Sequence, residues 1–465
     1  MKTRLFFSLS VALLILAGCG QKATEPVVIS GKALNYSDSI LFVTIDNVKD
    51  TIRLAADGSF TKEILIERPI YPNFQGNRLF AYLWLSPGGS LTIDFDATDF
   101  KNTLKFGGDL GLPNSWLLKK TDASRQNYMA INAAYRAPNQ AADFRRVCDS
   151  VYAVEQGMFD GFLAENPDLD ADFIRMEKIA VKYSWLANLQ SYPTRVNYYN
   201  DQATVPDDWF NFMEGVSIDD PALLDVPDAK YFLVGLAGDK ALKRSGIEQK
   251  DSWANPTLLR TTFEVVENEF THPEVVDVLL FEKLKQHLDA TSPDGIGDLV
   301  ELYLALAVDA KRAETISKLY DEWQALAAGQ PAPAFTVVDI EGNEHSLSDF
   351  AGKLVFIDFW ATWCGPCKVE IPFLKQLHED YKDTDLVVMS ISVDKDKAAW
   401  EKMITDEGYE WLQYHDGVNA NDLYMVKYIP TFVLIGRDGN LINVRAPNPS
   451  SDQLRPMIDK ALGGG

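Results

Sequence analysis

Residues 354–372 read LVFIDFWATWCGPCKVEIP, and this stretch decides the fold of the C-terminal part of the chain. Its first half is apolar except for Asp358, which is typical of a central strand buried on both faces. The run stops at a turn of small residues that carries Cys364 and Cys367. From Lys368 onward apolar residues recur at helical spacing. The stretch therefore predicts a strand, a tight turn and a helix, with both cysteines at the turn.

The position of the cysteines at a helix start predicts their chemistry. Unpaired N–H groups and a partial positive charge at a helix N-terminus favour a thiolate over a thiol. In such Cys-x-x-Cys motifs the first pKa falls from about 8.5 to about 3.5–7.5. Cys364 is therefore the predicted nucleophile, and Cys367, one turn later, the thiol that resolves the mixed disulfide. Gly365 and Pro366 suit a tight turn into a helix, and Trp363 is predicted to shield the sulfur pair.

The cysteine pair could also be part of a zinc site or a static structural disulfide. A zinc site needs two further ligands, and the nearby His345, His378 and His415 do not have a ligand-like spacing. A static structural disulfide is the stronger alternative, but a short loop between a strand and a helix favours exchange chemistry. The sequence therefore favours a redox site, and the two thiols imply no cofactor.

Together, WCGPC and its flanking motifs resemble thioredoxin, and more closely the TlpA/ResA-type extracytoplasmic thioredoxins. The lead-in at 329–353, GQPAPAFTVVDIEGNEHSLSDFAGK, resembles the N-terminal hairpin of that group. Glu370 and Pro372 match the E-x-P of its first active-site helix. Residues 394–414 resemble its inserted helix and strand, and Ile429-Pro430-Thr431 resembles its cis-proline loop. The resemblance covers about residues 327 to 463 and implies a thioredoxin-like α/β domain.

The resemblance implies roles for two further residues. Pro430 corresponds to the cis-proline whose neighbouring backbone faces the sulfur pair and pairs with a substrate peptide, although most X-Pro bonds are trans. Asp358 corresponds to the buried aspartate of thioredoxin, whereas many TlpA/ResA relatives have another residue there. A lone carboxylate in an apolar strand would have a raised pKa and could accept the proton of Cys367 during resolution. The alternative is a solvated or hydrogen-bonded aspartate at a strand end.

The N-terminus reads as a targeting segment. Lys2 and Arg4 precede an apolar run that is short for a membrane span, and Leu16-Ala17-Gly18-Cys19 resembles the lipobox of bacterial lipoproteins. We expect a signal peptide at 1–18, lipidation of Cys19 and a tether at 19–26. An ordinary cleaved signal would instead leave an exposed thiol in an oxidising compartment. The expected location is the bacterial cell envelope, facing the periplasm, with acyl chains as the anchor and no transmembrane helix.

Composition limits the remaining possibilities. The chain has 465 residues, 46% of them hydrophobic, which is ample for two or three folded domains. With Cys19 assigned to lipid and Cys364 and Cys367 to redox chemistry, only Cys148 remains, so no disulfide framework is expected. The net charge of −23 argues against nucleic acid as a partner.

Short β-branched and aromatic runs separated by turn residues predict a β-rich domain at 27–108. The expected architecture is an antiparallel β-sandwich, similar in pattern to the β-rich domain of unknown function that often precedes TlpA-like modules. The predicted strands are 27–30, 39–45, 51–54, 59–66, 79–85 and 90–95.

An α-helical region is predicted at 109–326, before the thioredoxin-like domain at 327–465. Pro193, Pro206, Pro221 and Pro227 are expected to break its middle into shorter pieces. Stretches with helical spacing of apolar residues include 143–166, 172–189, 229–243, 258–269, 273–288 and 297–325.

The helical region contains a group of aromatic residues and a lone cysteine. The aromatic residues could line a sugar or peptide groove, but helix packing is the favoured interpretation. Cys148 is interpreted as a small buried apolar residue. The aromatic group consists of Tyr183, Trp185, Tyr192, Tyr198, Tyr199, Trp209, Phe210 and Phe212.

The sequence as a whole predicts a membrane-tethered thiol-disulfide oxidoreductase. Its expected partners are disulfide-containing client proteins and a membrane or periplasmic electron donor. The dipeptide Gly365-Pro366 is that of thioredoxin, which favours reduction of clients, whether as a general thioredoxin or in cytochrome maturation. A disulfide oxidase or isomerase is the first alternative. Another is a binding or scaffold lipoprotein whose redox pair is regulatory. A peroxidase is disfavoured because the P-x-x-x-T-x-x-C pattern is absent around Cys364.

Overall fold

The computed structural model describes residues 25–45, 48–136, 141–199, 204–416 and 420–463. The predicted signal peptide, Cys19 and most of the tether at 19–26 lie outside the described residues. The chain divides into two compact units. The first comprises residues 1–214 and 222–232, and the second comprises 215–221 and 233–465. The predicted boundaries at 108/109 and 326/327 remain predictions.

The β-rich part of the first unit consists of two four-stranded sheets. One has the order β4-β1-β7-β8 and the other β3-β2-β5-β6. The strands are β1 (Val27–Leu34), β2 (Ile40–Ile45), β3 (Val48–Arg53), β4 (Ser59–Ile64), β5 (Asn73–Gly76), β6 (Leu79–Tyr82), β7 (Ser90–Asp96) and β8 (Lys105–Gly107).

Two details of these sheets differ from the prediction. β5 and β8 were missed because strands of four and three residues are too short to show an alternating pattern. β1 pairs with β7 in parallel, whereas the other pairings of the described strands in these sheets are antiparallel. The parallel pair joins strands far apart in sequence, which local pattern does not reveal.

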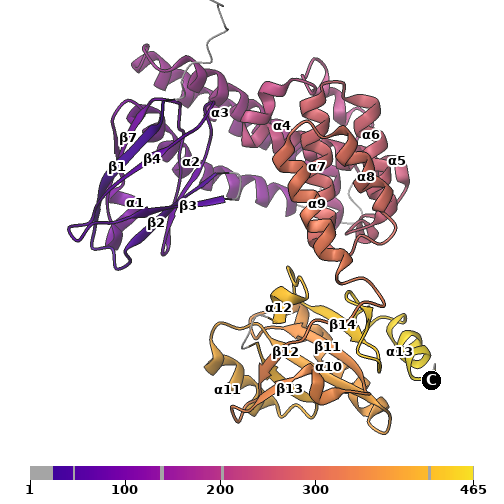
Figure 1. Cartoon of the computed structure of the whole chain (residues 1–465). Helices are drawn as coiled ribbons and strands as arrows, with labels where there is room; N and C mark the ends of the chain where they lie inside the picture. The colour runs from indigo at the N-terminus through magenta and orange to yellow at the C-terminus, as the bar shows by residue number, and fades with distance from the viewer. Residues whose placement is uncertain (1–24, 46–47, 137–140, 200–203, 417–419, 464–465) are drawn as a thin grey trace, which may run out of the picture. The chain divides into compact units, whose positions relative to one another are not determined.

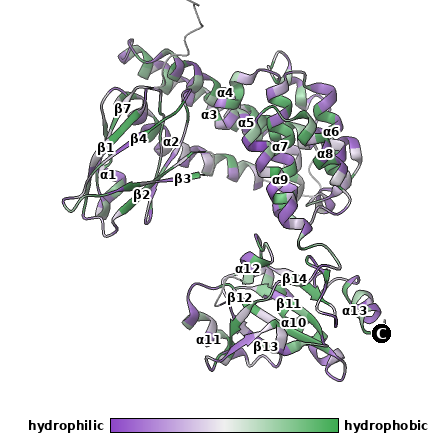
Figure 2. Ribbon diagram, in the orientation of Figure 1, coloured by the Kyte–Doolittle hydropathy of each residue, from purple (hydrophilic) through white to green (hydrophobic). Residues whose placement is uncertain are grey.

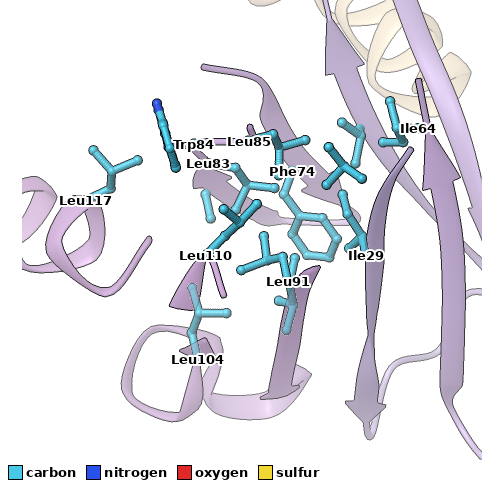
Figure 3. Close-up of a cluster of buried hydrophobic side chains, with 14 of the residues drawn as sticks. Ile29, Ile64, Phe74, Leu83, Trp84, Leu85, Leu91, Leu104, Leu110 and Leu117 are labelled. Atoms are coloured by element: carbon cyan, nitrogen blue, oxygen red, sulfur yellow. The ribbon is translucent and has the colours of Figure 1, made fainter. Parts of the chain in front are cut away.

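The core of this domain lies between the inner faces of the sheets (Figure 3). Alternate residues of β1 and β7, such as Ile29 and Leu91, are fully buried, as expected for strands with one face on a core. Helix α2 (Gly111–Arg136) closes the core, because its Asn114 donates to Trp84 O and accepts from Trp84 N, both at 2.9 Å. Leu117, one turn later, belongs to the same core.

Helices make up most of residues 111–324. They are α2 (Gly111–Arg136), α3 (Ala141–Glu165), α4 (Ala171–Tyr199), α5 (Pro227–Ser245), α6 (Pro256–Glu269), α7 (Pro273–Ala290), α8 (Gly297–Leu306) and α9 (Ala310–Gln324). Shorter helices are α1 (Phe100–Thr103), η1 (Ala97–Asp99), η2 (Trp209–Met213), η3 (Pro221–Asp225) and η4 (Gln249–Asp251). No helix among the described residues is long and apolar enough to cross a membrane.

The predictions for this region were wrong at two places. The predicted helix at 297–325 is divided into α8 and α9, because Asp309 leaves the helical conformation and caps α9 by accepting from Lys311 N and Arg312 N. Pro193 does not end a helix and lies inside α4. On either side of it, Tyr192 and Val196 are buried, so tertiary packing offsets the local cost of the proline.

The aromatic residues of the first unit pack into a core, as the favoured interpretation predicts. Tyr192 and Trp209 lie at most 6% exposed in one cluster with Phe144, and the Tyr192 and Phe144 ring centroids are 4.5 Å apart. Phe210, at 39% exposed, faces solvent. The side chains of Tyr198 and Tyr199 lie outside the described residues. Cys148 is buried in the same cluster, and burial raises the pKa of its thiol to about 12, as expected for an inert apolar cysteine.

The C-terminal domain belongs to the second unit and is built on a seven-stranded sheet of order β10-β9-β13-β12-β11-β14-β15 (Figure 1). Its strands are β9 (Thr336–Val338), β10 (Glu344–Ser346), β11 (Leu354–Trp360), β12 (Leu386–Ser392), β13 (Leu412–His415), β14 (Thr431–Ile435) and β15 (Leu441–Asn443). Its helices are α10 (Gly365–Tyr381), α11 (Lys397–Glu407), α12 (Ala420–Leu423), α13 (Leu454–Gly463) and η5 (Leu347–Phe350).

Strand β11 is the centre of this sheet. Every one of its seven residues is buried, as predicted for the apolar run, and it pairs in parallel with β12 and antiparallel with β14. Figure 2 shows the hydrophobic colouring of β11 and β14. Leu374 of α10 and Leu454 of α13 pack with Phe356 of β11 in one cluster. The strand is thereby held rigidly, and the turn that follows it carries the two cysteines.

Candidate active site

The start of helix α10 places Cys364 against backbone N–H groups. The helix begins at Gly365, Pro366 lies in its first turn, and Cys364 is the N-cap residue. Its Sγ accepts a hydrogen bond from the Cys367 backbone N–H at 3.1 Å. This is the position in which a hydroxyl or carboxylate usually caps a helix, so the backbone and the helix dipole both favour negative charge on the sulfur.

The two cysteines form a disulfide with a Cα–Cα distance of 5.3 Å. Cys364 is 4% exposed and Cys367 is 3% exposed. They pack in a cluster with Trp360 and Trp400, the latter from α11. Trp363 is 70% exposed, so most of its indole faces solvent, and the predicted shielding role remains a prediction. Sequence reasoning missed Trp400, because nothing in a local motif links α11 to the sulfurs.

The loop before β14 approaches the disulfide. Its Ile429–Pro430 peptide bond is cis. The Ile429 carbonyl oxygen lies 3.7 Å from Cys364 Sγ. Because β14 pairs directly with β11, the loop and the cysteine turn emerge from neighbouring strands. A backbone carbonyl and a reactive sulfur thus sit side by side at the surface where an extended peptide could pair.

Asp358 lies inside the sheet beneath the cysteine turn. It is 3% exposed, and its Oδ2 accepts from Ser390 Oγ at 2.8 Å. Ser390 Oγ in turn accepts from Trp411 Nε1 at 2.8 Å. Burial raises the pKa of Asp358 from 3.8 to about 7; the Ser390 hydrogen bond lowers it, and the nearby Glu370 raises it. Asp358 is therefore hydrogen-bonded rather than solvated, and it is poised to exchange a proton near neutral pH.

Glu370, one helical turn after Cys367, is anchored to the loop before α13. It is 6% exposed and accepts from Ser450 N at 3.0 Å, Ser450 Oγ at 2.8 Å and Asn448 Nδ2 at 3.2 Å. These three donors satisfy a carboxylate that burial would otherwise disfavour. The sequence singled out Glu370 as part of a motif but did not reveal its partners, which lie about eighty residues away.

Asp394 holds the turn between β11 and Cys364. Its carboxylate accepts from Thr362 N and Thr362 Oγ1, both at 2.8 Å, and from Ser392 Oγ at 2.7 Å. It is 4% exposed and lies two residues after the end of β12. Because β11 and β12 are parallel, their C-terminal ends meet at one edge of the sheet, and a carboxylate there can reach the cysteine turn. The position of Asp394 just after an apolar strand could have indicated this role from the sequence, but the sequence analysis did not use it.

The fold and the site together define a class of protein. A dithiol pair at the N-terminus of a helix, after the central strand of a mixed sheet and beside a cis-proline loop, is the arrangement of a thioredoxin-like thiol-disulfide oxidoreductase.

Comparison with known proteins agrees with this class. The profile of the AhpC/TSA family matches residues 328–444. The thiol-disulfide oxidoreductase ResA of Geobacillus kaustophilus is 36% identical over 129 residues, which are 27% of this chain and 72% of that protein. ResA of Bacillus anthracis is 31% identical over 28% of this chain and 77% of its own length. Through its C-terminal domain the chain belongs to the ResA-type thiol-disulfide oxidoreductases.

Solved structures of similar proteins cover the same domain. A crystal structure of a Bacteroides vulgatus protein assigned as a thiol-disulfide oxidoreductase is 40% identical, covers 30% of this chain and 99% of its own, and has a TM-score of 0.29. The thioredoxin domain of another Bacteroides vulgatus thiol-disulfide oxidoreductase is 30% identical with the same coverage and a TM-score of 0.27.

Proposed function

We propose that this protein is a lipid-anchored, periplasm-facing reductase of client-protein disulfides. The observation that carries the proposal is the capping position of Cys364, whose sulfur accepts a backbone hydrogen bond at 3.1 Å. A thiolate in that position is stabilised as the attacking group. The dipeptide Gly365-Pro366 is the one found in thioredoxin and supports the reducing direction.

In the proposed cycle, the Cys364 thiolate attacks one sulfur of a client disulfide, and the client S–S bond breaks as the Cys364–client bond forms. The released client thiolate takes up a proton. Cys367 then loses its proton to Asp358 and attacks Cys364, so that the second client thiolate leaves. Two electrons pass to the client and the Cys364–Cys367 disulfide remains. A donor of two electrons, from the membrane or the periplasm, must then reduce it.

Pro430 and Trp363 have positioning roles in this proposal. The loop ending at cis-Pro430 presents the Ile429 carbonyl beside Cys364, where it can accept a backbone N–H from an extended client segment. The exposed indole of Trp363 supplies apolar contact area next to the sulfurs.

The direction of the reaction is tested by the reduction potential of the Cys364/Cys367 pair. We expect a value near about −270 mV, as in thioredoxin. The pair is equilibrated in dithiothreitol or glutathione buffers and read by thiol trapping, using full-length protein in mild detergent. A Cys148→Ser variant should give the same value, because Cys148 is buried away from solvent. A value near about −120 mV would overturn the reducing direction in favour of an oxidase or isomerase.

The anchor is tested separately at Cys19. Wild-type protein expressed in a bacterial host should incorporate radiolabelled palmitate and sediment with membranes. The Cys19→Ser variant should lose the label and be released from the membrane fraction. A matched Cys148→Ser variant should retain both. Label-free protein that still sediments with membranes would contradict lipid anchoring.

A further inference from the structure

The first unit contains a cavity of about 600 Å³, remote in sequence from the redox motif. It lies between strands β5 and β6 of the β-rich domain and helices α2, α3, α4 and the start of α5. All of these lining residues belong to the first unit. A cavity of this size matches those that hold small ligands. No step of disulfide exchange uses it, so its lining needs a separate explanation.

The floor of the cavity is a buried ion pair. Glu177 of α4 is fully buried, and one of its oxygens accepts from Lys120 Nζ of α2. The Tyr71 hydroxyl lies 3.4 Å from its other oxygen. Both oxygens of Glu177 are therefore occupied, and Lys120 balances its charge. A charged pair this deep is costly to build for stability alone.

Two further carboxylates lie within range of this pair. Glu155 of α3 accepts from Asn127 Nδ2 at 2.8 Å, and Asp228, in the first turn of α5, accepts from the Ser184 side chain. Each hydrogen bond engages one part of the carboxylate and leaves capacity for another donor. Burial raises the pKa of both groups, while Lys120 lowers it. The net result is a raised pKa for both carboxyl groups, so Lys120 and the two hydrogen bonds do not fully offset the cost of burying these charges.

The charges that line the cavity do not cancel. Among its described lining residues, the three carboxylates face two cations, Lys120 and Arg195. Arg195 is engaged elsewhere as well, since its guanidinium lies 5.2 Å from the centre of the Tyr135 ring. Counted with every group ionised, one negative charge is left in excess. Glu177 is fully buried and Glu155 and Asp228 are partly buried, so a matching cation would interact more strongly there than in bulk water.

The rim of the cavity is aromatic. Tyr82 is 53% exposed and Tyr231 is 66% exposed, and both line the cavity. Tyrosine rings attract ammonium and guanidinium groups and also pack against the apolar stem of a ligand. Asn73, Asn188 and Ser191 add uncharged hydrogen-bonding groups to the wall.

We propose that this cavity binds a ligand carrying one protonated amine, which Asp228 and Glu155 recognise beneath the tyrosine rim. The amine belongs either to a small free molecule or to a lysine side chain of a peptide, because both present the same ammonium on an apolar stem. The site is independent of disulfide exchange, so its test does not depend on the redox cycle.

Calorimetry of the full-length protein in mild detergent tests the proposal with three probes. n-Butylamine represents a free amine, Nα-acetyl-lysine methylamide represents a peptide lysine, and Nα-acetyl-norleucine methylamide is the neutral control. We expect at least one amine to bind at least about tenfold more tightly than the norleucine probe. The stronger of the two amines identifies the source. Absence of binding by both amines up to about 10 mM, or equal binding of the neutral probe, would overturn the proposal.

Variants locate the binding. Asp228→Asn and Glu155→Gln keep side-chain shape and should each weaken the preferred amine at least about tenfold, whereas Glu165→Gln, an exposed residue of the same unit, should not. Unchanged affinity in both cavity variants would overturn the assignment. Hydrogen exchange of the wild type provides a readout free of folding effects. The amine should protect peptides of α3 and of the start of α5, which carry Glu155 and Asp228, and protection confined to segments that do not line the cavity would contradict the site.

Discussion

Replacing Cys367 with serine is expected to turn the protein from a turnover catalyst into a trap for its clients. Cys364 would retain its cap position and could still attack a client disulfide, but no thiol would remain to resolve the mixed disulfide. Turnover in a dithiothreitol-coupled insulin reduction assay should fall by at least about a hundredfold, while covalent adducts accumulate on non-reducing gels.

Two companion variants make this result specific. Cys364→Ser should lose turnover to the same extent but form no adduct, because the attacking sulfur is missing. Cys148→Ser should behave like the wild type, since that thiol is buried and its pKa is raised to about 12. If Cys364→Ser formed adducts through Cys367, the assignment of nucleophile and resolving thiol would have to be reversed.

The second large effect concerns Asp358 and pH. With a pKa of about 7 when folded and 3.8 as its reference value, the carboxyl binds its proton more tightly in the folded state. Folding favours the protonated form of Asp358, so below about pH 4 this residue does not reduce the free energy of unfolding. The reduction grows between about pH 4 and 7 and stays constant above that. The full difference corresponds to up to about 4 kcal/mol.

Asp358→Asn should therefore stabilise the C-terminal domain at pH 8 by up to about 4 kcal/mol and leave it nearly unchanged at pH 4. The protein is unfolded in urea with the disulfide intact, and unfolding is measured as proteolytic cleavage within β11. This readout separates the transition of the C-terminal domain from that of the first unit. Asp452→Asn, which removes an exposed carboxylate from the same domain, should show no such pH-dependent gain. An equal effect of Asp358→Asn at both pH values would exclude titration of Asp358 as the cause.

The same substitution should slow the reaction although it stabilises the folded domain. Without a proton acceptor, resolution by Cys367 at pH 8 should slow by about ten- to a hundredfold. The rise of the rate through about pH 7 should also flatten. A gain in stability without any loss of rate would show that Asp358 is a buried structural residue only.

Sequence pattern predicted the C-terminal domain well because its signals are local. The apolar run of β11, the cysteine turn and the start of α10 are adjacent in the chain, and the structure has a strand, a turn and a helix in that order with Cys364 just before the helix. The helix and strand expected in 394–414 are present as α11 and β13. Each of these elements satisfies its own periodicity, so no distant partner was needed to identify it.

What sequence pattern missed depends on contacts between distant segments. Asp394 reaches Thr362 because two parallel strands end at one edge, and Glu370 finds Ser450 only through packing of α10 and α13. The persistence of α4 through Pro193 likewise depends on burial of the residues around it. The cavity in the first unit draws its walls from strands β5 and β6 and from helices α2 to α5, which lie far apart in the sequence.

The hydrogen bond that Cys364 accepts comes from the main chain of its own helix and not from a side chain. The stabilisation that this hydrogen bond gives the sulfur therefore depends on the path of the backbone and not on the side chain of Cys367 or of an exposed neighbour. Exposed residues near the cysteine turn and the cis-proline loop, such as Trp363 and Tyr428, which are 70% and 51% exposed, can then change without loss of this hydrogen bond. A lineage could exchange one set of clients for another through such surface changes while the electron-transfer step itself stayed constant.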